Sequence, residues 1–289
     1  MNDIKDKIKS GITILDGAMG TMLSQYLSPG ELPEMLLIRD PSIVIELHEA
    51  YINAGSDIIE TDSFSSNAVR LGVEIGNPLV KKLNLKAATV AKEAAKGMTY
   101  VAGSIGPLGK MIEPFGEVSI DEALRVFIEQ ASALAEGEVD LIIIETMSDL
   151  NEAKIAVRAV KEACDLPVFA SLSFDESLRT TMGVKPEDAA KELSESGAFA
   201  VGANCGVGSD ITYRVMKEMI EGSPGLIYFT QPNAGMPKLV NGKTVYGESP
   251  EYMAGYAKKF VDIGVNIVGA CCGSKPEHIR AIKNILSSY

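Results

Sequence analysis

Short apolar segments rich in valine and isoleucine recur along the whole chain, and their spacing constrains the fold more than any other feature. Each segment leads into a turn of small or polar residues and then into a segment whose apolar residues recur with helical periodicity. The eight segments are residues 12–16, 56–60, 99–103, 140–145, 168–173, 199–204, 226–231 and 266–270. Continuous apolar strands that alternate with helices are typical of a parallel sheet covered on its outer face.

Eight strand–helix units in 289 residues predict a (β/α)8 TIM barrel, for which about 250 residues is typical. The helical segments support this fold, since they begin at Pro or Ser and end at Gly. They include residues 41–55, 119–137, 186–197, 209–222 and 250–264. An open doubly wound sheet is the alternative, but it normally carries a G-x-G-x-x-G turn after its first strand, and residues 17–20 read Gly-Ala-Met-Gly. We predict one barrel domain over residues 1–289, undivided by any linker.

Three long segments interrupt the regular unit, at residues 21–40, 107–118 and 234–249. All three follow predicted strands, so we expect them on the face of the barrel where active sites are built. The third contains Asn241-Gly242, which predicts a hairpin between residues 238–240 and 244–246.

The charge and the cysteine content exclude several classes of function. A formal net charge of −12 argues against a nucleic-acid or anionic-membrane partner. The chain has no run of 18 apolar residues and no signal-peptide pattern, so we expect a cytoplasmic protein without a membrane partner. In that compartment four cysteines favour metal binding or catalysis over disulfides. Cys164, at the end of the helical segment 150–163, is interpreted as a packing residue.

Polar side chains follow most of the predicted strands. In chain order they are Asp16, Glu60, Thr61, Asp62, Glu145, Thr146, Asn204, Cys205, Gln231, Asn233, Cys271 and Cys272. One strand separates the sixth from the eighth, so their ends lie about 10 Å apart at about 4.8 Å per strand. Thiols from Cys205, Cys271 and Cys272 could therefore share one metal ion.

Three thiolates with an open fourth position are what a catalytic zinc site requires. His48 and His278 belong to helical segments, and we interpret both as surface or packing residues rather than as the fourth ligand. A thiol bound to zinc loses its proton, so the implied chemistry is attack by a substrate sulfur. Glu145 could bind an ammonium group that Asp16 orients. Three other interpretations are open. The two acids could cap helices, and the three thiols could be buried packing residues. A zinc ion could also be structural, in which case its loss in a Cys205→Ala variant would unfold the barrel.

Motifs at five strand ends resemble those of the zinc-dependent homocysteine S-methyltransferases, over essentially the whole chain. They are residues 16–21 (Asp-Gly-Ala-Met-Gly-Thr), 144–146 (Ile-Glu-Thr), 202–205 (Gly-Ala-Asn-Cys), 232–235 (Pro-Asn-Ala-Gly) and 269–273 (Gly-Ala-Cys-Cys-Gly). The resemblance implies that Cys205, Cys271 and Cys272 bind zinc. It implies that the homocysteine thiolate takes the open position and that Glu145 binds the amino group. The residues it implies for the amino-acid pocket are Asp16, Gly17, Ala18, Thr61, Asn204 and Asn233.

The strand-1 turn is most similar to the N-terminal homocysteine-binding domain of cobalamin-dependent methionine synthase. This implies methylcobalamin as the methyl donor, carried by a separate corrinoid protein or domain. The Met1 start and the final helix before Tyr289 favour a stand-alone enzyme over a fragment.

The alternatives are a small methyl donor, namely S-methylmethionine, S-adenosylmethionine or betaine, and a non-catalytic module that binds zinc or a thiol amino acid. Betaine is disfavoured because the chain has no Trp for an aromatic cage. Residues 61–64 read Thr-Asp-Ser-Phe where methionine synthases resemble Thr-Asn-Thr-Phe, so Asp62 adds a negative charge at the barrel mouth.

Overall fold

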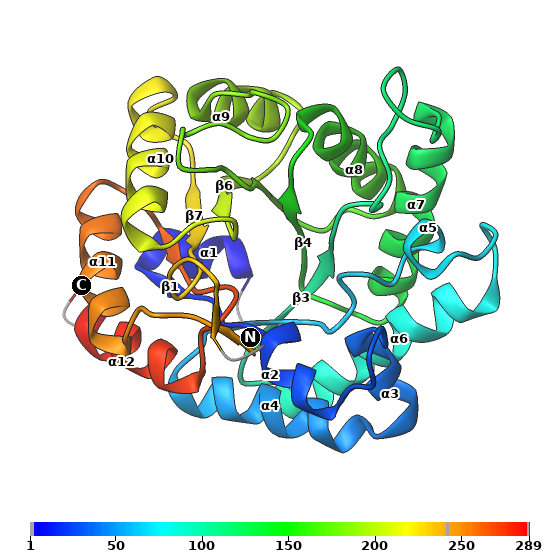
Figure 1. The fold of residues 1–289 in the computed structure, drawn as a ribbon, viewed down its shortest axis with the longest axis horizontal. Coiled ribbons are helices and arrows are strands. Elements are labelled where there is room, and N and C mark those ends of the chain that lie inside the picture. The colour runs from blue at the N-terminus through cyan, green and yellow to red at the C-terminus, as the bar shows by residue number, and fades with distance from the viewer. Residues whose placement is uncertain (1–2, 241–242, 288) are drawn as a thin grey trace.

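The computed structural model describes residues 3–240, 243–287 and 289, and it contains eight parallel strands that curve around a common centre (Figure 1). The strands are β1 (Thr13–Ile14), β2 (Ile58–Glu60), β3 (Tyr100–Ile105), β4 (Leu141–Met147), β5 (Val168–Leu172), β6 (Ala200–Asn204), β7 (Tyr228–Gln231) and β10 (Ile267–Val268). Their order is β1-β10-β7-β6-β5-β4-β3-β2. Between β1 and β2 the amide of Asp57 donates to the carbonyl of Ile14 at 2.7 Å, which nearly closes the barrel.

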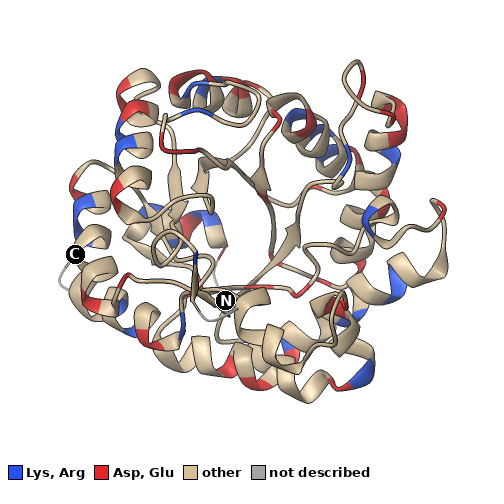
Figure 2. Cartoon of the chain, viewed as in Figure 1, with Lys and Arg blue, Asp and Glu red and all other residues tan. Residues whose placement is uncertain are grey.

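A helix follows every strand and covers the outside of the sheet, which confirms the predicted (β/α)8 barrel. These helices are α4 (Pro41–Ala54), α6 (Pro78–Ala95), α7 (Ile120–Glu136), α8 (Leu150–Ala163), α9 (Pro186–Glu195), α10 (Ser209–Gly222), α11 (Pro250–Asp262) and α12 (Pro276–Leu286). Most of the Lys, Arg, Asp and Glu residues that Figure 2 colours lie on these outer helices. In the described ranges no helix is both long and apolar enough to cross a membrane.

The first long segment, residues 21–40, was expected to be a loop and instead consists largely of short helices. They are α2 (Gly20–Leu23), η1 (Ser24–Tyr26), η2 (Pro33–Met35) and α3 (Leu36–Arg39), and a further short helix, α5 (Ala68–Leu71), follows β2. The predicted hairpin is confirmed as an antiparallel pair, β8 (Lys238–Val240) and β9 (Lys243–Val245). Its turn residues, 241–242, lie outside the described residues.

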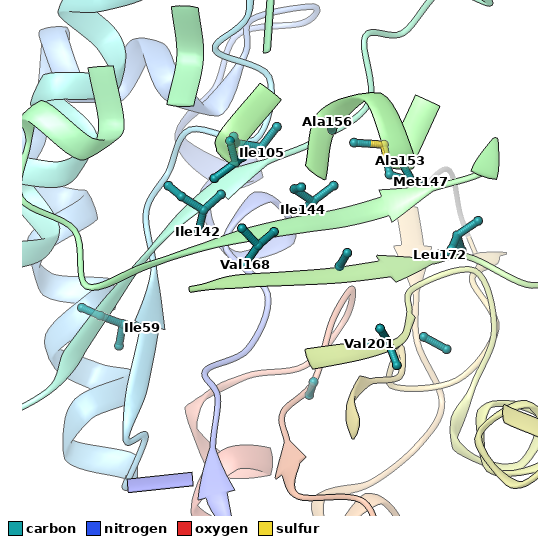
Figure 3. Close-up of a cluster of buried hydrophobic side chains, with 14 of the residues drawn as sticks. Ile59, Ile105, Ile142, Ile144, Met147, Ala153, Ala156, Val168, Leu172 and Val201 are labelled. Atoms are coloured by element: carbon teal, nitrogen blue, oxygen red, sulfur yellow. The ribbon is translucent and has the colours of Figure 1, made fainter. Parts of the chain in front are cut away.

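Two apolar layers form the core, because successive side chains of a strand point to opposite faces. On β4, Leu141 and Ile143 pack inside the barrel, where α1 (Ile4–Ser10) also contributes Ile4 and Ile8. The outward residues Ile142 and Ile144 belong to the outer cluster, and Figure 3 shows Ile144 on the side of the strand that faces Ala153 and Ala156 of α8. The same alternation puts the next residue of the inner row, Glu145, inside the barrel at its carboxyl-terminal mouth.

Candidate active site

Three thiols converge at this mouth, as the sequence predicts. Cys205 follows β6, and Cys271 and Cys272 follow β10, with β7 between the two strands. The three sulfur atoms all lie within 4.8 Å of one another, and those of Cys205 and Cys272 are 3.8 Å apart. The fourth cysteine, Cys164, follows α8 and packs at the edge of the outer core, which confirms its interpretation as a packing residue.

Backbone contacts between the strand-end loops hold the thiols in place. The amide of Cys205 donates to the carbonyl of Gln231 at 3.0 Å, and the amide of Cys271 donates to the carbonyl of Pro232 at 2.8 Å. The carbonyl of Cys272 accepts from Ala234 at 2.9 Å. Cys205 has φ 57°, a left-handed conformation that costs a non-glycine residue about 1–3 kcal/mol. The surrounding contacts therefore maintain a strained residue that presents its thiol to the cluster.

The sulfur cluster concentrates negative charge on one atom. Hydrogen bonds from Cys205 and Cys271 lower the pKa of the Cys272 thiol to about 3, and a hydrogen bond from Tyr246 acts in the same direction. The hydrogen bonds that Cys271 makes with Cys205 and Cys272, together with burial, raise its own pKa well above the usual value. These shifts favour a thiolate at Cys272 beside two thiols, and a bound cation would favour deprotonation of all three.

The donor set fits a thiophilic metal ion such as zinc, for which thiolate is a preferred ligand. Neither histidine belongs to the cluster, as expected. His48 is fully buried in α4. The Nδ1 of His278 accepts from the amide of Lys275 at 3.1 Å within the first turn of α12. A metal ion bound by the three sulfurs would therefore have a fourth coordination position that neither histidine fills.

A cavity of about 430 Å³ opens beside the sulfurs, within the range that small-molecule sites occupy. The lining residues are Gly17, Ala18, Met19, Gly20, Thr21, Pro33, Glu34, Glu60, Thr61, Asp62, Phe64, Ser65, Arg70, Ser104, Pro107, Glu145, Thr146, Cys205, Gln231, Ala270, Cys271 and Cys272. Of the residues predicted for substrate binding, Gly17, Ala18, Thr61 and Glu145 line the cavity. The others, Asp16, Asn204 and Asn233, are buried and are not among the residues that line it.

Glu145 is held in a network of hydrogen bonds at the base of the cavity. Its Oε1 accepts from the Ser104 hydroxyl at 2.7 Å, and its Oε2 accepts from Asn204 Nδ2 and from the Thr146 hydroxyl, each at 3.3 Å. Burial raises the pKa of Glu145. The helix-capping alternative does not hold for Glu145, because Asp149 caps α8 by accepting from the amide of Asn151 at 2.8 Å.

Two further buried acids stand next to Glu145. Burial, followed by the charges of Glu145 and Asp16, raises the pKa of Glu60 well above its usual value. Glu60 also accepts from Gln231 Nε2 at 2.6 Å. Asp16 accepts from the amide of Glu60 at 3.0 Å and has its own pKa raised, mainly by burial. The three acids therefore bind protons more tightly than exposed carboxyl groups do, and a cationic group in the cavity would compete with those protons.

The strand-1 turn approaches the site so closely that residue 17 must be glycine. A Cβ there would lie 2.7 Å from Ser274 Oγ and 2.8 Å from a ring carbon of Tyr51. The Tyr51 hydroxyl donates to the carbonyl of Ala18 at 2.8 Å, and the amide of Ala18 donates to Ser274 Oγ at 3.0 Å. Helix α4 and the loop after β10 thus fix the turn that lines the cavity.

Several residues of the site were missed in the sequence, namely Ser104, Glu34, Arg70 and Tyr246. Ser104 is the penultimate residue of β3, so a reading of inward positions along this strand could have found it. Glu34 lies in η2, Arg70 in α5 and Tyr246 just after β9. These three belong to connecting segments without strand or long-helix periodicity, so no comparable signal marks them.

Replacing Glu60 with glutamine should stabilise the protein increasingly as the pH rises. Because the pKa of Glu60 is raised in the folded state, the folded protein retains a proton that the unfolded chain releases above its ordinary pKa near 4.3. That difference favours unfolding of the wild type as the pH rises toward the folded-state pKa, and Gln has no such proton. Urea unfolding at pH 5, 6.5 and 8 measures the effect. A difference between variant and wild type that is the same at all three values would contradict it.

Comparison with known proteins identifies relatives of this barrel. The family model for homocysteine S-methyltransferase matches residues 13–286. The metallated form of the homocysteine methyltransferase MmuM from Escherichia coli aligns with a TM-score of 0.82 and 21% identity, over 98% of this chain and 99% of that chain. Its apo form gives 0.76 and 22%, over 98% of each chain. A methyltransferase from Methanosarcina mazei gives 0.65 and 11%, over 99% of this chain and 97% of that chain. At these identities the solved structures support a common fold.

Proposed function

The chain belongs to the homocysteine S-methyltransferase family, and we propose on that basis that it transfers a methyl group to the sulfur of homocysteine, giving methionine. The observation that carries the proposal is the convergence of three thiols beside a cavity whose base holds the buried acid Glu145. We take residues 1–289 as one homocysteine-binding barrel domain. A purely structural metal is not favoured, because the sulfurs of Cys205, Cys271 and Cys272 line the cavity instead of being enclosed.

In this proposal Cys205, Cys271 and Cys272 hold a zinc ion, whose charge, when it is bound, keeps the substrate thiol deprotonated at neutral pH. Glu145 binds the substrate ammonium, since it is a buried acceptor that Ser104 and Asn204 hold in one orientation. Removal of water from this cavity strengthens the attraction between the two charges.

The remaining residues of the pocket act by shape and by supporting the residues that line it. Gly17 and Ala18 allow the strand-1 turn to approach the amino acid, and Thr61 lines the adjoining wall. Asp16 supports the amide of Glu60 from behind, and Asn233 lies in the loop that carries the Cys271 contact. The substrate sulfur then attacks the methyl carbon, the new carbon–sulfur bond forms, and the electron pair of the broken bond leaves with the donor.

Two kinds of methyl donor are compatible with the proposed function. The strand-1 motif favours methylcobalamin on a separate corrinoid protein, and the cavity of about 430 Å³ offers a small donor an alternative. Purified zinc-loaded protein should be mixed with homocysteine and, in turn, methylcobalamin, S-methylmethionine, S-adenosylmethionine and betaine. Methionine formation with one donor class is the expected result. No methionine from any of the four, with the protein folded and metal bound, would overturn the proposed function.

A further inference from the structure

Glu248, on the segment that follows the hairpin, joins the two loops that carry the cysteine thiols. Its carboxylate binds the start of α10, where Oε1 accepts from the amide of Ser209 at 3.0 Å and Oε2 accepts from the Ser209 hydroxyl. Its carbonyl accepts from Nε2 of His278, in the first turn of α12, at 3.2 Å. Its amide donates to the carbonyl of Ala234 at 2.9 Å, and the amide of Ala234 donates to the carbonyl of Cys272. One residue thus connects α10, α12 and the loop after β7.

Both helices begin shortly after a cysteine, so their positions affect the thiols. Only residues 206–208 separate Cys205 from α10, and residues 273–275 separate Cys272 from α12. The first of these links is itself held in place, because the amide of Val207 donates to the carbonyl of Cys205 at 2.8 Å. The distance between the two helix starts therefore constrains the distance between the sulfurs of Cys205 and Cys272, which is 3.8 Å.

Two glycines leave room for the segment that carries Glu248. A Cβ on Gly208, just before α10, would lie 2.3 Å from Oε1 of Glu248. A Cβ on Gly273, the residue after Cys272, would lie 2.1 Å from Cγ of Tyr246 on the same segment. Residues 246–248 therefore lie against both cysteine loops, at positions where any larger residue would push the segment away.

A helix-capping role is the simpler interpretation of the Glu248 carboxylate. Gly208, the N-cap of α10, has no side chain that can accept from the first amides of the helix, and Glu248 accepts in its place. A negative charge at this end of a helix is also favourable. Capping explains the contacts with Ser209, but it does not require the contacts of the same residue with His278 and Ala234. The two interpretations differ in what they predict for metal binding.

We propose that Glu248 is a positioning residue for the metal site, which holds the loop of Cys205 at the distance from Cys271 and Cys272 that a shared ion requires. The inference rests on the proposed function only for the identity of the ion as zinc. Ligands that are already held in place lose less conformational freedom when an ion binds, so the connection increases metal affinity. Glu248 is not among the residues that line the cavity, so it acts through the loops.

The zinc affinity of the full chain, measured by competition with a chromophoric chelator, tests this role without any methyl donor. Glu248→Ala should weaken zinc binding about 10- to 100-fold, the usual effect of removing a residue that orients metal ligands. Glu248→Gln should bind zinc within about threefold of the wild type, since its amide group can accept from the Ser209 amide and donate to the Ser209 hydroxyl. The cobalt(II) form reports on geometry. Its sulfur-to-cobalt charge-transfer intensity per ion should fall in Glu248→Ala and be restored in Glu248→Gln.

The matched control is Ser119→Ala, which removes a helix cap on the opposite side of the barrel from α10 and α12 (Figure 1). The Ser119 hydroxyl accepts from the amide of Glu122 at 3.1 Å at the start of α7. Both Ser119→Ala and Glu248→Ala should lower the midpoint of thermal unfolding of the metal-free protein, because each removes a cap. Ser119→Ala should leave the zinc affinity and the cobalt spectrum unchanged.

The outcomes separate this inference from the proposed function. A zinc affinity and a cobalt spectrum that Glu248→Ala leaves unchanged would overturn the inference and leave the proposed function standing. So would an equal loss of affinity in Ser119→Ala, since affinity would then follow stability alone. Weaker zinc binding in Glu248→Ala, with no methionine formed by the wild type from any donor, would support the inference while the proposed function fails.

A second variant covers the case in which Glu248→Ala does not fold. Ser209→Ala removes the hydroxyl contact and keeps the contact of the amide with Glu248. It should weaken zinc binding about fivefold, since one hydrogen bond of the connection is lost. An affinity equal to that of the wild type would contradict the positioning role.

Discussion

A Cys205→Ala variant is expected to remain folded, to lose its metal and to lose its activity. The side chain is only partly buried and belongs to neither apolar core cluster, so its removal leaves the packing of the barrel intact. Two sulfurs, those of Cys271 and Cys272, cannot hold zinc as three do. We expect bound zinc to fall from about one to below about 0.1 per chain, and kcat/KM to fall at least about 100-fold. Elemental analysis and methionine formation measure the two effects.

The matched control for this variant is Cys164→Ala, which removes a thiol far from the cluster in the fold. It should keep its full zinc content and its full activity. Circular dichroism and the thermal midpoint decide the alternative role of the metal. If Cys205→Ala unfolds, or if zinc removal by a chelator unfolds the wild type, the metal is structural and the catalytic interpretation of the cluster is wrong.

The barrel could be predicted because an apolar strand segment followed by a helical segment recurs along the chain. All eight strands lie within or overlap the apolar segments, although β1 and β10 have only two residues each where five were expected. Backbone hydrogen bonds nevertheless continue past both strands, since the amide of Leu15 donates to Val268 at 3.0 Å and the amide of Ala270 donates to Asp16 at 3.1 Å. Helix α6 carries ordinary start signals, an Asn77 cap and Pro78, and could have been predicted too.

The site was predictable to the extent that strand ends supply it. Cys205, Cys271 and Glu145 follow directly from strand positions, because parallel strands bring their carboxyl ends together. Strand position alone does not say whether a buried polar residue lines the cavity or supports the lining from behind. Asn204 is of the second kind, since its amide group orients Glu145 and Thr146.

Site residues that lie on connecting segments could not be predicted from the sequence. Glu34 enters the cavity because η2 folds back over the loop after β2, where its carboxylate accepts from Ser65. Such a contact spans 31 residues and depends on tertiary packing rather than on local pattern. The sequence shows Asp62 only as an added charge at the barrel mouth, whereas its proximity to Glu34 depends on the fold.

A Glu145→Gln variant is expected to lose most of its affinity for homocysteine while retaining its zinc. Gln occupies the same volume and can still accept from the Ser104 hydroxyl, so the change is mainly the loss of a negative charge. Truncation of one partner of a buried, hydrogen-bonded charge pair costs about 2–5 kcal/mol, which corresponds to a rise in the dissociation constant of about 30-fold or more. Isothermal titration with homocysteine, together with elemental analysis, measures both quantities.

The control for Glu145→Gln is Glu152→Gln, which neutralises another buried acid of raised pKa on the following helix. Burial raises the pKa of Glu152 to about 7, yet this residue lies outside the cavity lining. If the affinity for homocysteine depended on the general field of buried acids, both substitutions would weaken it similarly. If Glu145 binds the ammonium directly, only Glu145→Gln will do so. Equal affinities in Glu145→Gln and the wild type would remove Glu145 from the substrate pocket and leave Glu60 as the candidate ammonium ligand.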